Sequence, residues 1–260
     1  MKFFSASASF LLCVAGLMIS CVSYADETIE VVSSEGSVMA GEIHGKANIP
    51  VQSKSILPGK NVIVTGAAAR AVVRVGADGF VVIGKNSQVE ISKPKEKEKD
   101  NAGFFRQVTG VVYYALNSVK GSQHPIEVRT ATATLGIRGT RFLVTDITGR
   151  NEIGMRKGLI SVASPDGEFE IHKKAEADEF EAFKHEGELA VAKAKREFEE
   201  YKANTQKEFI EYKKEFSLGA NRMATFDGKR VEDRPLSEES KKDMESFETY
   251  SARWLKDVRD

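Results

Sequence analysis

Between residues 28 and 163 the chain is a succession of short runs rich in β-branched and aromatic residues, separated by glycine, asparagine, aspartate and proline. Such runs are typical of strands, and turn-forming residues at near-regular intervals are typical of an all-β sandwich, barrel or solenoid. Long helical periodicity is absent from this part. The runs are 28–33, 62–64, 71–75, 79–83, 88–91, 111–115, 126–135, 141–144, 153–156 and 159–163. We therefore expect residues 26–172 to form one β domain.

Residues 1–25 have the features of a secretory leader. Lys2 is their one cation, residues 10–19 form an apolar run, and Ser23-Tyr24-Ala25 offers small residues at the cleavage positions. The apolar run is much shorter than the ~20 residues that span a bilayer. The sequence predicts a signal peptide cleaved after Ala25 and export to the periplasm.

Both cysteines of the chain, Cys13 and Cys21, precede this cleavage site. Cleavage after Ala25 would leave a chain without thiols, which excludes a disulfide framework and a thiol nucleophile. A second interpretation remains open, in which Met18-Ile19-Ser20-Cys21 is a lipoprotein signal and Cys21 is the acylated first residue.

Lys plus Arg equal Asp plus Glu at 38 each, so the net charge is zero. No global field attracts the chain to nucleic acid or to an anionic membrane. The balance conceals a change of composition, because Val, Gly, Thr and Ile dominate up to residue 172 and Glu, Lys, Ala and Phe dominate from Lys173 onward.

The β part carries a recognisable order of short motifs, of which Ile137-Arg138-Gly139-Thr140-Arg141-Phe142-Leu143-Val144 is the most specific. The others are Gly36-Ser37-Val38, Leu57-Pro58-Gly59, Gly79-Phe80-Val81-Val82-Ile83, Thr109-Gly110-Val111-Val112-Tyr113 and Gly158-Leu159-Ile160-Ser161-Val162. Over residues 31–162 this order resembles the FecR domain. The family usually has proline where this chain has Ala131.

The resemblance implies a periplasmic, non-enzymatic β module that binds or relays. Full-length sigma-factor regulators of this kind carry a cytoplasmic anti-sigma segment and a membrane helix before the domain. The sequence shows neither, so we expect the periplasmic module alone and no direct regulation of a sigma factor. The resemblance also marks Arg138, Gly139, Thr140 and Phe142 as a signature with a structural or recognition role.

The alternating run 130–135 (TATATL) leads into this signature. If it is one strand, Thr130, Thr132 and Thr134 project from one face and Ala131, Ala133 and Leu135 from the other. We expect the alanines and the leucine to pack inward and the threonines to pair across strands outside. The strand would turn between Gly136 and Gly139, and Arg138 is the residue to test for recognition.

From Lys173 to Phe216 the sequence predicts one long charged helix or a helical hairpin. Related hexamers begin at residues 179, 197 and 208, and their aromatic residues fall on one stripe of a helix. A continuous helix here would be about 65 Å long at ~1.5 Å per residue. The stripe is a candidate contact surface, formed by Phe180, Phe183, Phe198, Tyr201, Phe209 and Tyr212. It could pack within the chain, bind a partner, or self-associate as in a coiled coil.

The end of the chain returns to the β pattern before a last helix. Residues 217–235 are predicted to form a strand, a turn and a strand that close the domain. Residues 236–260 are predicted to form a C-terminal helix, which Ser237 caps and in which Glu238 and Glu239 occupy the first turn.

Motifs for catalysis are absent from the sequence. The four histidines His44, His124, His172 and His185 have no metal-ligand spacing, and no P-loop, nucleophile elbow or dinucleotide fingerprint occurs. We therefore expect no enzymatic activity and no cofactor. The leading hypothesis is an exported binding or signalling module that contacts a protein of the cell envelope. The alternatives are an envelope scaffold or cell-wall polysaccharide-binding protein and, third, a glycan lyase.

Overall fold

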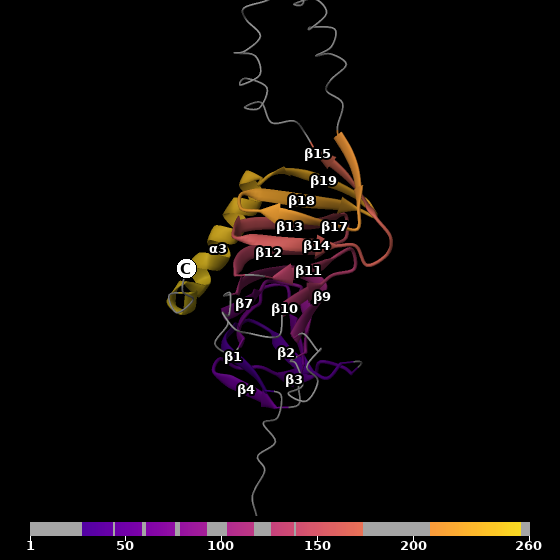
Figure 1. The fold of residues 1–260 in the computed structure, drawn as a ribbon. Coiled ribbons are helices and arrows are strands. Elements are labelled where there is room, and N and C mark those ends of the chain that lie inside the picture. The colour runs from indigo at the N-terminus through magenta and orange to yellow at the C-terminus, as the bar shows by residue number, and fades with distance from the viewer. Residues whose placement is uncertain are drawn as a thin grey trace, which may run out of the picture.

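The computed structural model describes residues 28–43, 45–58, 61–75, 79–92, 103–116, 126–137, 139–173 and 209–255 (Figure 1). In this part of the chain, strands form two mixed sheets and one helix lies near the C-terminus. The prediction of a mainly β chain with a C-terminal helix is thus confirmed. None of the helices in these residues is long and apolar enough to cross a membrane.

The first sheet, sheet A, runs the length of the molecule. Neighbouring strands are antiparallel except for the parallel pair β15 and β19. Its order is β4 (Ser55–Pro58), β1 (Thr28–Glu35), β6 (Arg70–Val75), β7 (Gly79–Ile83), β9 (Gly103–Leu116), β12 (Thr140–Ile147), β13 (Arg150–Lys157), β18 (Arg222–Asp227), β19 (Arg230–Pro235), β15 (Phe169–Lys173) and β16 (Phe209–Lys213).

The second sheet, sheet B, shares β9 with the first. Its order is β3 (Ile49–Pro50), β2 (Val38–Gly41), β5 (Val62–Thr65), β8 (Gln88–Ser92), β9, β10 (Ile126–Arg129), β11 (Thr134–Ile137), β14 (Leu159–Ala163) and β17 (Glu215–Gly219). Strand β9 pairs in sheet B through its first half and in sheet A through its second half. The two sheets therefore form a sandwich that is continuous through β9.

Gly110 lies where β9 passes from one sheet to the other. Its φ of +104° belongs to the region that side chains with a Cβ rarely adopt, and a Cβ here would lie 2.1 Å from Ser87 Oγ. The hydroxyl of Ser87 accepts the N–H of Val111 over 3.0 Å. The crossing thus requires glycine, both for its backbone shape and for the close approach of β8.

The main core lies between the two sheets and follows the alternation of each strand. On β12, Phe142 and Val144 point into this core, while Leu143 points to the opposite face of sheet A. The ring of Phe142 stacks on Tyr114 of β9 at 4.9 Å between centroids. The two rings are cross-strand neighbours within sheet A, and Tyr114 also packs edge-on against Phe105, in the half of β9 that belongs to sheet B, at 5.8 Å between centroids.

A second core lies on the outer face of sheet A under α3 (Glu238–Leu255). The helix supplies Met244, and Leu236 precedes it. Both side chains pack over Gly154 of β13, where a Cβ would lie 2.9 Å from each of them. Ser237 Oγ accepts the N–H of Ser240 over 3.2 Å and so caps the helix as expected.

The prediction of a helix over 173–216 is wrong at its end. Residues 174–208 lie outside the described part of the chain, but β16 and β17 occupy Phe209–Lys213 and Glu215–Gly219. Strand β16 pairs with β15, and β17 pairs with β14. The hexamer from residue 208 fits a strand as well as a helix, because its last four residues, 210–213, alternate apolar and charged side chains, and pairing with an existing sheet decides between the two.

Candidate functional site

The run that the sequence suggested as one strand, 126–135, is a hairpin of β10 and β11 with a turn at residues 130–133. Thr130 forms this turn, because its Oγ1 accepts the N–H of Ala133 over 3.0 Å and that of Thr132 over 3.2 Å. Threonine hydroxyls favour such local bonds to the backbone over continuation of a strand. The single-strand interpretation is wrong here, although Ala133 and Leu135 do point into the core as expected.

The turn lies against the end of sheet A, where it and sheet A border a small recess that has no room for a water molecule. Sheet B contributes Thr130 and Thr132, whose hydroxyls are 3.2 Å apart. Sheet A contributes polar side chains from the β12–β13 hairpin. The residues that line the recess are Thr130, Thr132, Val144, Thr145, Asp146, Asn151, Glu152, Ile153 and Phe226.

Asp146 is the acidic group of β12 in this recess. Its pKa is raised because burial disfavours the charged carboxylate, while the backbone N–H of Ala131 lowers it in part. The amide of Asn151, oriented to satisfy both of its polar atoms, donates to Asp146 Oδ1 over 3.0 Å. Oδ2 is buried and has no hydrogen-bond partner among the described residues. One buried oxygen of this carboxylate is therefore left without a hydrogen bond among the described residues.

Two exposed apolar side chains adjoin, in sequence, the residues that join β9 to the end of β12. Thr109 Oγ1 donates to the carbonyl oxygen of Asp146 over 3.0 Å, which joins β9 to the end of β12. Val108 precedes Thr109 and Ile147 follows Asp146, and their side chains are 40% and 39% exposed. We name Val108, Thr130, Thr132, Asp146 and Ile147 the end surface. It combines apolar groups with hydroxyl and carboxylate groups, a composition suited to contact with another molecule.

A buried glutamine fixes the strands behind the end surface. Gln107 Nε2 donates to the carbonyl oxygens of Gly110 and Val144 over 2.9 and 3.2 Å. Its Oε1 accepts the hydroxyl of Tyr114 over 3.2 Å. These bonds hold β9 against β12 at the bend, so the end surface is built on rigid strands.

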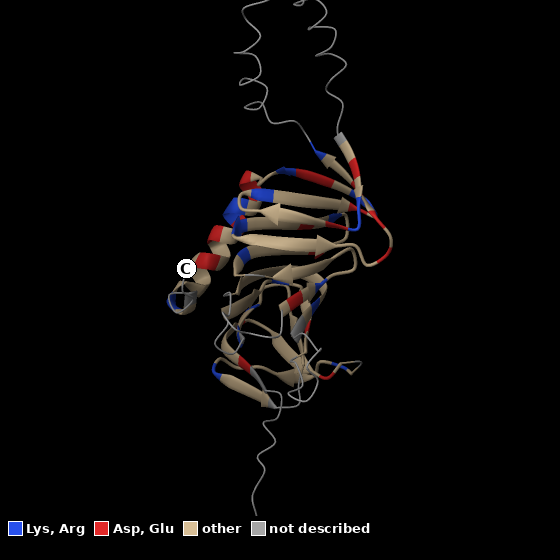
Figure 2. Ribbon diagram, viewed as in Figure 1, with Lys and Arg blue, Asp and Glu red and all other residues tan. Residues whose placement is uncertain are grey.

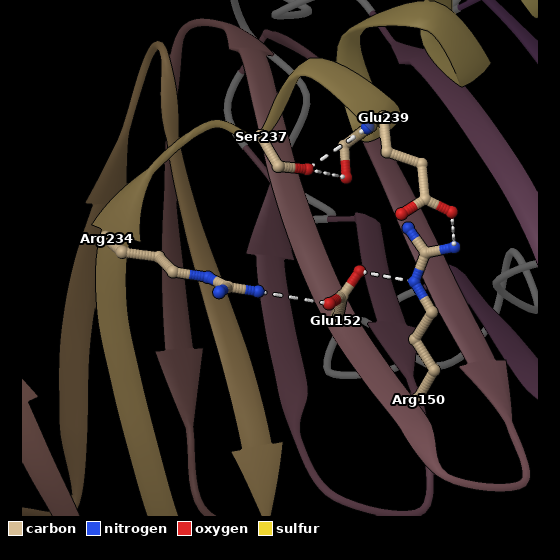
Figure 3. A network of polar contacts seen from close by, with 6 residues as sticks. Arg150, Glu152, Arg234, Ser237 and Glu239 are labelled. Atoms are coloured by element: carbon tan, nitrogen blue, oxygen red, sulfur yellow. Dashed lines mark hydrogen bonds and ion pairs between the residues drawn. The ribbon is translucent and has the colours of Figure 1, made fainter.

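A chain of ion pairs leads from the recess to α3 (Figure 3). Glu152 accepts Arg150 Nε over 2.7 Å and Arg234 over 3.3 Å. The same Arg150 donates to Glu239 in the first turn of α3 over 2.9 Å. The network connects β13, β19 and α3, and Figure 2 shows cationic and anionic residues intermixed along the helix. It fixes the helix relative to the hairpin that carries Asp146.

The described residues of the predicted signature lie away from the end surface. Gly139, with a φ of +67°, is at the corner between β11 and β12. Thr140 is buried, and Phe142 lies in the sandwich core. Arg138 is outside the described residues, so its predicted recognition role stays a prediction.

Two of the six residues of the predicted helical stripe can be placed in the structure. Phe180, Phe183, Phe198 and Tyr201 are outside the described residues. Phe209 and Tyr212 belong to β16 instead of a helix, and the side chain of Tyr212 is 64% exposed.

Sequence reasoning missed the acidic and amide groups of the recess. Asp146 and Asn151 flank the turn at Thr148-Gly149. Turn residues between two strands are the sequence feature that could have drawn attention to them. Within the described ranges, no group of three or more His, Cys, Asp or Glu side chains could hold a metal ion.

Residues 61–161 match the family model described as FecR protein. The expected resemblance is confirmed over this range, which begins just before β5 and ends within β14 and includes the whole end surface. A comparison with curated proteins gave no match.

Two crystal structures of a candidate anti-sigma factor from Parabacteroides distasonis ATCC 8503, at 1.65 Å and 2.50 Å resolution, are similar to the chain at 10% identity and a TM-score of 0.43. Each alignment covers 68% of this chain and 60% of the other. The chain therefore spans less than two thirds of the length of the structures that it matches.

Proposed function

We propose that the protein is an exported, non-enzymatic FecR-like signalling module that contacts a protein partner of the cell envelope through the end surface. The observation that supports this proposal most is the position of the end surface. It lies inside the FecR-matched residues 61–161 and includes two exposed apolar side chains, those of Val108 and Ile147. The matched family is regulatory, which favours a role in signalling.

The dimensions of the recess favour a macromolecular contact over a small ligand. Pockets for small molecules commonly enclose about 300–1,000 Å³ and bury most of the ligand. The recess has no room even for a water molecule, so it offers no cavity for a small ligand. A loop or strand of a partner could instead cover the exposed apolar side chains of Val108 and Ile147.

Export is proposed from the leader alone. Residues 1–25 have the cation, apolar run and cleavage-site residues of a secretory signal. Lipid attachment at Cys21 is the competing outcome, and both place the β domain outside the cytoplasm.

Binding of cell-wall polysaccharide, the alternative function, would need aromatic faces that are open to sugar rings. Near the end of α3, the guanidinium of Arg253 lies 3.9 Å from the ring centroid of Trp254, and that of Arg70 lies 5.0 Å from that of Tyr250. One face of each ring is thus occupied by an arginine of the same chain. Tyr212 of β16, which is 64% exposed, is an open ring, so the protein-partner hypothesis rests on the end surface and not on a lack of aromatic faces.

A photo-crosslinking amino acid at position 147 tests the proposal in intact envelopes. We expect a discrete crosslinked protein from position 147 and none from position 56, the matched control. Ile56 is 65% exposed on the edge strand β4, outside the matched region. Equal products from both positions, or none from position 147, would contradict the proposal. Retention of the protein on insoluble cell-wall polysaccharide would support the alternative.

A further inference from the structure

Strand β16 is the last strand of sheet A. It pairs with β15 in an antiparallel register that places Lys173 opposite Phe209 and Phe169 opposite Lys213. Within the described ranges, no strand pairs with its other edge. An edge of this kind presents backbone N–H and C=O groups that can pair with another chain.

The side chains of β16 make this edge attractive to an apolar partner. Ile210 and Tyr212, two residues apart, share one face of the sheet and are 47% and 64% exposed. Glu211 and Lys213 share the opposite face and form an ion pair with an N–O distance of 2.5 Å. The strand therefore alternates exposed apolar groups with charges of opposite sign.

We propose that β16 pairs with β16 of a second copy of this chain in an antiparallel arrangement centred on Tyr212. A two-fold axis perpendicular to the sheet brings each strand edge against its own equivalent, which gives a closed, isologous contact. Sheet A would continue from one copy into the other.

Charge complementarity selects this register. With Tyr212 opposite its equivalent, Glu211 of each copy faces Lys213 of the other, so that two opposite-charge pairs form. Centring the pair on Glu211 would place two carboxylates opposite each other, and centring it on Lys213 would do the same with two ammonium groups. Centring it on Ile210 would form neither ion pair.

The first test uses a cysteine at the proposed axis. Tyr212→Cys is introduced into the full-length chain with Cys13→Ser and Cys21→Ser, so that the new thiol is the only one. Directly opposed residues of antiparallel strands have Cβ atoms about 4.5–5.5 Å apart, close to the spacing in disulfides. We expect mild oxidation to give a disulfide-linked dimer from this variant and at least fivefold less from Ile56→Cys on β4. Equal dimer from both variants, or none from Tyr212→Cys, would overturn the proposal.

The second test reverses and restores the charge pattern. Sedimentation equilibrium should show a reversible dimer, and Glu211→Lys or Lys213→Glu should weaken it at least tenfold, because each places like charges opposite each other. The double variant Glu211→Lys/Lys213→Glu restores both pairs and should restore dimerisation. Lys46→Glu, an exposed loop residue, is the control, and circular dichroism confirms that each variant folds.

A monomer at all concentrations, or a double variant no better than the single ones, would contradict self-pairing at β16. Neither result bears on the end surface, because Asp146 and Ile147 lie within the FecR-matched residues 61–161, β16 lies outside them, and both residues are unchanged in these variants.

Discussion

The hydroxyl of Tyr113 in β9 donates to Glu248 of α3 over 2.6 Å, which joins two residues 135 positions apart in the chain. Arg156 lies 3.8 Å from the same carboxylate. Burial first, and then the bond to Glu248, raises the pKa of Tyr113 far above its ordinary value, so the hydroxyl remains a donor at any physiological pH. The helix is thus fixed to the outer face of sheet A by a charged hydrogen bond inside an apolar contact.

Tyr113→Phe should lower the free energy of unfolding by about 1.5–3 kcal/mol, the usual contribution of a hydrogen bond to a charged group. The stacking of residue 113 on Phe247, at 6.3 Å between centroids, remains possible in the variant. Tyr114→Phe is the matched control. It removes only the bond to the neutral amide of Gln107 and should cost about 0.5–1.5 kcal/mol. Urea unfolding measures both, and equal losses would contradict a special role for Glu248.

Gly110→Ala should destabilise the sandwich by more than about 3 kcal/mol, because strain at positive φ adds to a clash with Ser87. Gly149→Ala measures the cost of strain at positive φ without a clash. Its φ is +78°, and a Cβ there meets nothing within 4 Å, so we expect a loss of about 1–2 kcal/mol. Thermal unfolding compares the two, and a milder effect at Gly110 would show that β9 does not depend on glycine at the crossing.

Asp146→Asn should raise the stability at neutral pH. Burial raises the folded-state pKa of Asp146, so the folded chain holds its proton more tightly than the unfolded chain does. Stability associated with this group is therefore present below the unfolded pKa, near 3.9, and is lost as the pH rises through the folded pKa. The advantage of the asparagine variant should be absent at low pH and present at pH 7.

Unfolding in urea across that pH range measures the difference. An advantage that is independent of pH would contradict the electrostatic origin. A carboxylate that costs stability in the free protein is consistent with a group reserved for a partner.

A short turn should replace residues 174–208 without loss of the fold. Lys173 and Phe209 are directly opposed in the β15–β16 register, so a two-residue hairpin loop such as Asn-Gly spans the gap. We expect the same β-type circular dichroism spectrum and a similar unfolding midpoint. A chain that unfolds after this deletion would show that the segment belongs to the core. Deleting the whole predicted helical region 173–216 would also remove β16, so it would not test the role of residues 174–208 alone.

The leader makes a prediction for mass spectrometry. The protein isolated from envelopes should begin at Asp26, as expected for cleavage after Ala25. A diacylglyceryl-modified N-terminus at Cys21 would instead establish lipid anchoring, and an unprocessed chain would contradict export.

The alternation of β-branched and polar residues was sufficient to predict the β part, because one face of each strand is buried in the sandwich. The same logic correctly predicted that Ala133 and Leu135 point inward. It failed at Thr130, where a hydroxyl bonded to the backbone makes a turn inside a pattern that reads as a strand. Local side-chain chemistry overrode periodicity at this position.

The C-terminal end of the charged region shows that spacing alone does not decide between helix and strand. Phe209 and Tyr212 fit a helical stripe by spacing, but residues 210–213 also alternate apolar and charged side chains, and the open edge of β15 determines the outcome. The candidate site was beyond prediction for a different reason. Thr130 and Asp146 are brought together by the pairing of strands distant in sequence, a long-range relationship that leaves no local pattern.

The most direct test of the account is the yield of the crosslinked partner from position 147 when the end surface is altered. We predict that Val108→Asp lowers this yield at least fivefold, because it places a charge in the apolar part of the end surface, while Ile49→Asp on β3, where the side chain is 38% exposed, leaves it unchanged. An unchanged yield with Val108→Asp would contradict the assignment of the end surface as the contact site.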